Sequence, residues 1–156
     1  MPKPVFSLQI PGLRQLTERV HKHGAKIAAQ LHFGGLVAGY SAKWGLPLYA
    51  PAMPKPFEGD FGSQFMPEEL AAFSGSVTPE IKVMTKEDIA HVVNLYAQGA
   101  RRAKEAGMDA VEIHGGHGYL ISSFVSPSSN TRTDEYGGSL ENRLRLYVEV
   151  IQAVRK

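Results

Sequence analysis

The densest group of chemically versatile side chains in the sequence is the segment HGGHGY at residues 114–119. A neutral imidazole offers one N–H donor, and its charge changes near neutral pH. His114 and His117, three residues apart on a glycine-rich turn, can aim both donors at one oxygen and stabilise charge developing on a carbonyl or nitro group. The phenol of Tyr119 can give a proton to carbon as a general acid. These three residues form the candidate catalytic group.

Two other interpretations of this group stay open. Histidines in a loop are often plain polar surface, and spacing alone does not separate a surface from a site. A helical metal pair has four-residue spacing and a third ligand, so the pattern disfavours a metal site. Glu112 lies two positions before His114, on the same face of a strand. It is either an orienting partner or a buried, paired carboxylate, and the second is favoured. Residue types alone therefore predict a ligand site at a strand end.

The segments around this group alternate between predicted helix and predicted strand. In chain order we expect a helix at residues 12–23, a strand at 26–31, an irregular segment at 33–84, a helix from Thr85 to Gly107, a strand at 109–114, a helical turn within 118–126 and a last helix capped by Ser139. This order predicts an α/β fold with parallel strands. The first strand is short and largely apolar, as expected of a strand buried on both faces.

Both predicted strands end in side chains suited to binding. Gln30 lies at the end of the first, with His32 two residues later, and the second ends at His114. In barrels and open α/β sheets, ligands lie beyond the carboxyl ends of the strands. Two strands cannot close a sheet, and a (β/α)8 barrel takes roughly 250 residues. The chain of 156 residues is therefore expected to be a piece of one.

The irregular segment at 33–84 is rich in glycine and proline. Pro47, Pro51, Pro54 and Pro56 oppose both a helix and a central strand. Loops of this length in a compact domain are usually binding loops or lids. Its aromatic side chains argue against plain disorder: Tyr40, Trp44, Tyr49, Phe57, Phe61 and Phe65. We expect a loop that covers the site.

The composition excludes several classes of function. The chain contains no cysteine, which rules out disulfides, thiolate catalysis and cysteine-ligated zinc or iron–sulfur sites within it. A formal net charge of +2, spread along the chain, is no footprint of nucleic-acid binding. No apolar run is long enough for a signal peptide or a membrane span. We expect a cytoplasmic protein with neither nucleic acid nor membrane as partner.

One long segment resembles a known family. Residues 105–143 read EAGMDAVEIHGGHGYLISSFVSPSSNTRTDEYGGSLENR. They are similar to the signature region of the old yellow enzyme family, in its NADH:flavin oxidoreductase and 2,4-dienoyl-CoA-reductase-like branch, with the pattern AGxDxVEIHxxHGYL followed by FxSPxxNxRxDEYGGSxENR. Upstream, HGAKIAAQLHFGG at 23–35 and YAPA at 49–52 also resemble family segments. The similarity covers nearly all of this chain but only the middle of a family member.

The resemblance implies a fold and a set of residue roles. The fold is an FMN-linked oxidoreductase (β/α)8 TIM barrel, of which residues 1–156 form a single incomplete domain with about the third and fourth strands. Gln30 would bind the pyrimidine edge of FMN. His114 and His117 would hold the oxygen of the activating group, and Tyr119 would protonate the α-carbon. The loop containing Asn130 and Arg132 would be mainly structural.

The same resemblance implies a reaction. NAD(P)H would pass hydride to FMN, and the C=C bond of an α,β-unsaturated carbonyl compound or enoyl thioester would then be reduced. The partner is a small activated alkene, no metal ligand is expected, and the full-length parent is a candidate homo-oligomer. The strands missing from this chain carry most of the phosphate contacts, so we expect this polypeptide alone to bind FMN weakly and not to turn over.

The sequence departs from the family pattern in the spacer between the two histidines, Gly115-Gly116 where Gly-Ala is common, and in an upstream segment. The family's QLxHxGR segment reads QLHFGGL here, so Phe33 replaces a frequent histidine and Leu36 a frequent arginine.

Two alternative functions stay open. One alternative is a non-catalytic truncated product that needs a complementary half to fold. The other is a metal-dependent hydrolase on the same barrel, with the histidines as ligands.

Overall fold

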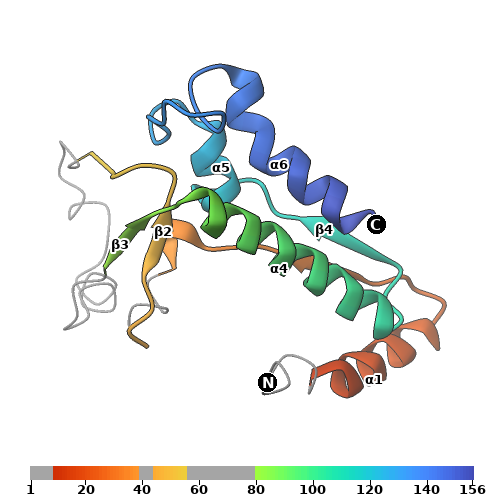
Figure 1. The fold of residues 1–156 in the computed structure, drawn as a ribbon. Helices are drawn as coiled ribbons and strands as arrows, with labels where there is room; N and C mark the ends of the chain where they lie inside the picture. The colour runs from red at the N-terminus through yellow and green to blue at the C-terminus, as the bar shows by residue number, and fades with distance from the viewer. Residues whose placement is uncertain (1–8, 39–43, 56–79) are drawn as a thin grey trace, which may run out of the picture. The chain divides into compact units, whose positions relative to one another are not determined.

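The computed structural model describes residues 9–38, 44–55 and 80–156 (Figure 1). They divide into two compact units, each assembled from segments distant in sequence. The first unit comprises the described parts of Met1–His32, Glu87–His114 and Leu146–Lys156. The second comprises the described parts of Phe33–Lys86 and Gly115–Arg145.

The first unit has the predicted alternation of helix and parallel strand. Its elements are α1 (Ile10–His21), β1 (Ala28–Leu31), α4 (Lys86–Glu105) and β4 (Ala110–Ile113), and β1 pairs in parallel with β4. In α4 the buried side chains recur at helical spacing: Ile89, Val92, Tyr96, Ala100 and Ala103. Gly107, with a φ of 84°, lies just beyond α4 in the left-handed conformation that commonly follows a helix. The predicted α/β class with parallel strands is confirmed.

Within the described residues the first strand is covered on one face, whereas burial on both faces was predicted. Along β1 the side chains alternate, with Ala28 and Gln30 exposed and Ala29 and Leu31 half-buried. A Cβ built on Gly99 of α4 would lie 3.3 Å from Leu31 Cδ2, so α4 packs closely on the Leu31 face.

The contacts of Asp109, which we call the Asp109 clamp, join the starts of the two strands. The carboxylate of Asp109, just before β4, accepts hydrogen bonds from Lys26 Nζ at 2.8 Å and from the Ile27 amide at 3.0 Å. Its Oδ2 also lies 2.7 Å from His21 Nε2. The bond from Lys26 is the largest of the interactions that hold the pKa of the Asp109 carboxyl well below its ordinary range. Asp109 therefore ties β4 to the segment that leads into β1.

The second unit contains strands that the sequence did not predict. Within the supposedly irregular segment lie η2 (Gly35–Val37), β2 (Leu48–Ala50) and β3 (Ile81–Val83), and β2 pairs in parallel with β3. These strands are three residues long, which is too short to show a period-two pattern. Residues 39–43 and 56–79 of the predicted covering loop, including Tyr40, Phe57, Phe61 and Phe65, lie outside the described residues.

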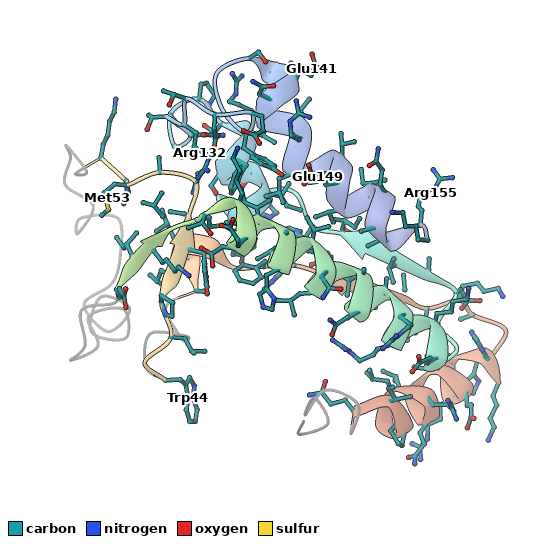
Figure 2. All side chains as sticks on the ribbon, viewed as in Figure 1. Trp44, Met53, Arg132, Glu141, Glu149 and Arg155 are labelled. Carbon is teal, nitrogen blue, oxygen red and sulfur yellow. The ribbon has the colours of Figure 1, made fainter. Side chains whose placement is uncertain are left out.

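Arg132, labelled in Figure 2, connects the ends of this small sheet to the loop after α5 (Leu120–Val125). Its Nη1 donates to the carbonyl of Pro51 at 2.9 Å and to that of Met84 at 2.6 Å. Its Nε and Nη2 bind both oxygens of Asp134, at 2.9 and 2.5 Å. This pairing lowers the pKa of the Asp134 carboxyl. The side chain of Arg132 is only 11% exposed, so a mostly covered guanidinium connects these segments.

Asn130 organises the same loop. The residue is buried, and its amide nitrogen donates to the carbonyls of Phe124 and Tyr136, both at 2.7 Å. Its Oδ1 accepts the amide of Arg132 at 3.1 Å. The hydroxyl of Ser139 accepts the amide of Asn142 at 3.2 Å and so caps α6 (Leu140–Val154). The structural role predicted for this loop and the predicted cap are confirmed.

Within the described ranges 9–38, 44–55 and 80–156, none of the helices combines the length and apolar character that crossing a bilayer requires.

Replacing Asp109 by Asn should reduce the dependence of stability on pH in acid. Because the folded carboxyl has a lowered pKa, its contribution is complete above the unfolded value of about 3.9 and is lost as pH falls through the folded value. Wild-type stability should therefore fall more steeply below about pH 4 than that of Asp109→Asn, in urea unfolding measured from pH 7 to pH 2.5. Glu18→Gln, an exposed substitution on α1, is the control. Equal slopes for wild type and Asp109→Asn would contradict the clamp.

Candidate functional site

The paired strands bring two polar side chains together on their exposed face. Gln30 of β1 stands opposite Glu112 of β4 in the parallel register. Its Nε2 donates to Glu112 Oε1 at 3.1 Å, and both residues are exposed. Glu112 was expected to be either an orienting partner or a buried, paired carboxylate. It is paired, as the favoured interpretation has it, and within this chain it is exposed.

One step beyond the strands, two imidazoles lie near each other. The amide of His114 donates to the carbonyl of Leu31 at 2.9 Å, which continues the pairing past β4. The rings of His32 and His114 have centroids 6.2 Å apart. His32 is exposed and His114 half-buried. The structure thus confirms that Gln30 and His114 belong to paired strand ends.

The turn after His114 holds a residue in an unfavourable backbone conformation. His117 has a φ of 59°, and it is the one non-glycine residue with positive φ in the described part of the chain. Left-handed backbone costs a residue with a Cβ about 1–2 kcal/mol. Such strain persists only where the surroundings impose it, and it concentrates at functional sites. Gly118 follows with a φ of 73°, where glycine carries no such penalty.

Several hydrogen bonds impose that conformation. The amide of Tyr119 donates to the Gly116 carbonyl at 3.2 Å. The hydroxyl of Ser122 lies within hydrogen-bonding distance of two carbonyls, that of Gly116 at 3.1 Å and that of Tyr119 at 3.0 Å. The amide of Leu120, the first residue of α5, donates to the Phe33 carbonyl at 3.1 Å. The turn is therefore fixed at both its start and its end.

The rings of His117 and Tyr119 are brought together by this turn. Their centroids are 6.5 Å apart with an interplanar angle of 78°. His117 is exposed and Tyr119 half-buried. The exposed Val37 of η2 lies beside the same turn, since a Cβ on Gly118 would be 4.0 Å from its Cγ2. An imidazole and a phenol thus share one rigid, accessible turn.

The predicted site residues fall into two groups. Gln30 and His114 belong to the first unit, and His117 and Tyr119 to the second. The structure gives the geometry within each group. The convergence of His114 and His117 on one oxygen stays a prediction.

Two contacts that support the candidate site were not predicted from the sequence. The Gln30–Glu112 bond depends on strand register, although the strand-end position of Gln30 pointed toward it. The role of Ser122 has a weak signal, a serine three positions after Tyr119, where its hydroxyl can reach back to the preceding turn.

The departure at Phe33 has a packing role. Its ring meets that of Tyr49 edge-on, with centroids 5.6 Å apart. Lys82 Nζ lies 5.5 Å from the centroid of the Tyr49 ring, a distance at which a cation is attracted to the ring. Phe33 therefore anchors the turn through its carbonyl while its side chain packs against the small sheet of the second unit.

The residues present suit one edge of a flavin. The pyrimidine edge of a flavin alternates carbonyl acceptors with an N–H donor, and a glutamine amide can both donate and accept. With one N–H proton of Gln30 directed to Glu112, the amide retains an acceptor oxygen and a second N–H proton. For a metal, no cluster of three or more His, Asp or Glu side chains within the described ranges could hold an ion.

Comparisons with known proteins agree with the resemblance in sequence. The sequence model of the NADH:flavin oxidoreductase / NADH oxidase family matches residues 6–156. An NADPH dehydrogenase of Clostridium acetobutylicum is 43% identical over 145 residues, which is 93% of this chain and 37% of that protein. An NADPH dehydrogenase of Bacillus subtilis is 42% identical over 147 residues, 94% of this chain and 37% of that protein.

A solved structure shows the same fold relationship. The crystal structure of Old Yellow Enzyme from Pichia sp. AKU4542 superposes with a TM-score of 0.77 at 36% identity, over 94% of this chain and 36% of that chain. This chain thus spans little more than a third of the length of these relatives. On the family match and these similarities, the chain belongs to the NADH:flavin oxidoreductase / NADH oxidase family, the family of old yellow enzyme and a group of oxidoreductases.

Proposed function

We propose that this chain is part of an FMN-dependent, NAD(P)H-consuming reductase that saturates the C=C bond of α,β-unsaturated carbonyl compounds or enoyl thioesters. One observation carries the proposal: His117 is held in a left-handed conformation beside Tyr119, on a turn that directly follows a parallel strand. A strained imidazole next to a phenol at a strand end is suited to holding an oxygen and delivering a proton.

We further propose that β1 and β4 are the third and fourth strands of a (β/α)8 barrel whose other strands lie outside residues 1–156. The exposed face of these strands, with Gln30 and Glu112 on it, would then face the barrel interior. Support comes from the similarity to Old Yellow Enzyme, which extends over 94% of this chain but 36% of that one. In this view residues 1–156 form one incomplete domain.

Gln30 would hold the pyrimidine edge of FMN. The amide of Gln30 stands at the carboxyl end of β1, where barrel enzymes bind their ligands. When bound, the flavin supplies the hydride chemistry, and NAD(P)H is the source of the two electrons. The protein's own contribution is binding, orientation and polarisation.

His114 and His117 would hold the oxygen of the activating group. Each donates an N–H to the oxygen on which negative charge builds up as the β-carbon gains hydride. Tyr119 holds a proton at Oη and releases it to the α-carbon. The alkene gains one hydride and one proton, NAD(P)H is oxidised to NAD(P)⁺, and solvent returns a proton to Tyr119, so atoms and electrons balance. The partner is a small activated alkene, and we propose a homo-oligomer as the assembled state.

A chimera tests this function and separates it from a non-catalytic truncated product. Residues 1–156 replace the matched segment of the Bacillus subtilis NADPH dehydrogenase, and we call this protein the completed barrel. It should retain FMN and oxidise NADPH with 2-cyclohexenone. In Tyr119→Phe, reoxidation of reduced flavin by the enone should slow by about 10²–10⁴-fold. Flavin reduction by NADPH and reoxidation by oxygen should not change, because neither needs this proton.

Circular dichroism and thermal melting establish that the completed barrel is folded. If it does not fold, the 156-residue chain is mixed with the host protein lacking that segment, and flavin binding is measured in the mixture. A folded completed barrel without flavin, or one in which Tyr119→Phe slows both half-reactions equally, would contradict the proposal. The 156-residue chain alone should bind FMN far more weakly than the completed barrel.

The strain at His117 predicts a conflict between stability and activity. His117→Gly and His117→Ala both remove the imidazole and should both impair enone reduction. Only glycine relieves the left-handed backbone, so His117→Gly should be more stable than His117→Ala by about 1 kcal/mol. Urea unfolding of the two variants measures this difference directly. Equal stability would show that the surrounding hydrogen bonds do not impose strain at this position.

A further inference from the structure

We propose that Glu112 is a positioning residue that determines which edge of the Gln30 amide faces the flavin. The inference rests on the proposed function, since it concerns how Gln30 meets the cofactor. Its basis is the contact between the two residues: they are direct partners in the β1–β4 register, and Gln30 Nε2 donates to Glu112 Oε1 at 3.1 Å.

The chemistry of the pair permits one orientation of the amide. An ionised carboxylate only accepts hydrogen bonds, whereas a glutamine amide has a donating edge and an accepting edge. Gln30 must therefore turn its nitrogen toward Glu112 and leave its oxygen and second N–H proton for a ligand. Hydrogen bonds to an ionised group are roughly twice as strong as neutral ones, so the Glu112 carboxylate holds the Gln30 amide firmly in this orientation.

Glu112 is the side chain directly opposite Gln30 in the strand register, and its carboxylate accepts the bond from the Gln30 amide. The neighbours of the pair toward the start of the strands are Ala28 and Ala110, whose methyl groups cannot form hydrogen bonds with an amide, and the neighbours toward the end are His32 and His114. Without the carboxylate, the Gln30 amide would lose the acceptor that favours this orientation. A flavin edge presents donors and acceptors in a fixed order, so only one orientation matches it.

A double-mutant cycle on FMN affinity in the completed barrel tests the inference. Glu112→Gln retains size and hydrogen bonding but lets both amides turn, which should raise the FMN dissociation constant about two- to tenfold. In a Gln30→Ala background the same substitution should have no further effect, because no amide remains to be oriented. Glu18→Gln, exposed on α1, should leave the affinity unchanged. Additive effects of the two substitutions would overturn the inference.

An exchange of the two residues separates orientation from sheet stability. The double variant Gln30→Glu with Glu112→Gln restores a glutamine–glutamate pair between the strands but presents a carboxylate to the ligand. We expect its melting temperature to return toward that of the wild type while its FMN affinity stays reduced. Full recovery of FMN affinity would assign the pair a purely structural role and overturn the inference.

A measurement without flavin completes the design. In ¹⁵N-edited NMR of the 156-residue chain, the Gln30 side-chain amide should show one proton in a hydrogen bond that Glu112→Gln weakens. An unchanged Gln30 signal would show that Glu112 does not fix the orientation of the Gln30 amide, and would overturn the inference. A folded completed barrel that binds no FMN would overturn the proposed function and, with it, the role of Glu112 toward the cofactor. FMN binding that is insensitive to Glu112 would overturn this inference alone.

Discussion

The parallel pairing of β1 with β4 is the constraint on which the candidate site depends. It sets Gln30 opposite Glu112, and the bond from the His114 amide to the Leu31 carbonyl extends it beyond the strands. Parallel strands require a crossover connection, and a helix usually supplies it. Here α4 has that place in the chain, between the segment after β1 and the start of β4. The Asp109 clamp secures the opposite end of the same pair.

The second unit holds the turn with His117 and Tyr119 by a different means. It has only two three-residue strands in its described part, so side chains carry much of the connection between its segments. Arg132 and Asn130 bind carbonyls that the loops and strand ends leave free of regular pairing. Ser122 does the same for the turn that contains His117. Rigid support of this kind is what allows a turn to keep a histidine in a left-handed conformation.

The sequence predicts those features of the fold that repeat along the chain. The helix from Thr85 and the strands that end at Leu31 and His114 follow from periodicity and from flanking glycines, and the structure confirms them. Strands β2 and β3 are too short to leave a pattern. The exposure of Ala28 and Gln30 within this chain was not predicted, because alanines look apolar whether or not a neighbour covers them. The Gln30–Glu112 bond needs the register between segments that are 82 residues apart. Local patterns do not contain that information.

The central claim is that the carboxyl ends of β1 and β4 together form a flavin site, with Gln30 as the anchor. A crystal structure of the completed barrel with FMN tests it most directly. The account predicts a flavin whose pyrimidine edge is bonded to the Gln30 amide oxygen, with Glu112 on the nitrogen of the same amide and His114 and His117 directed to one point above the ring. A flavin bound away from these strand ends, or a Gln30 amide that faces away from it, would contradict the account.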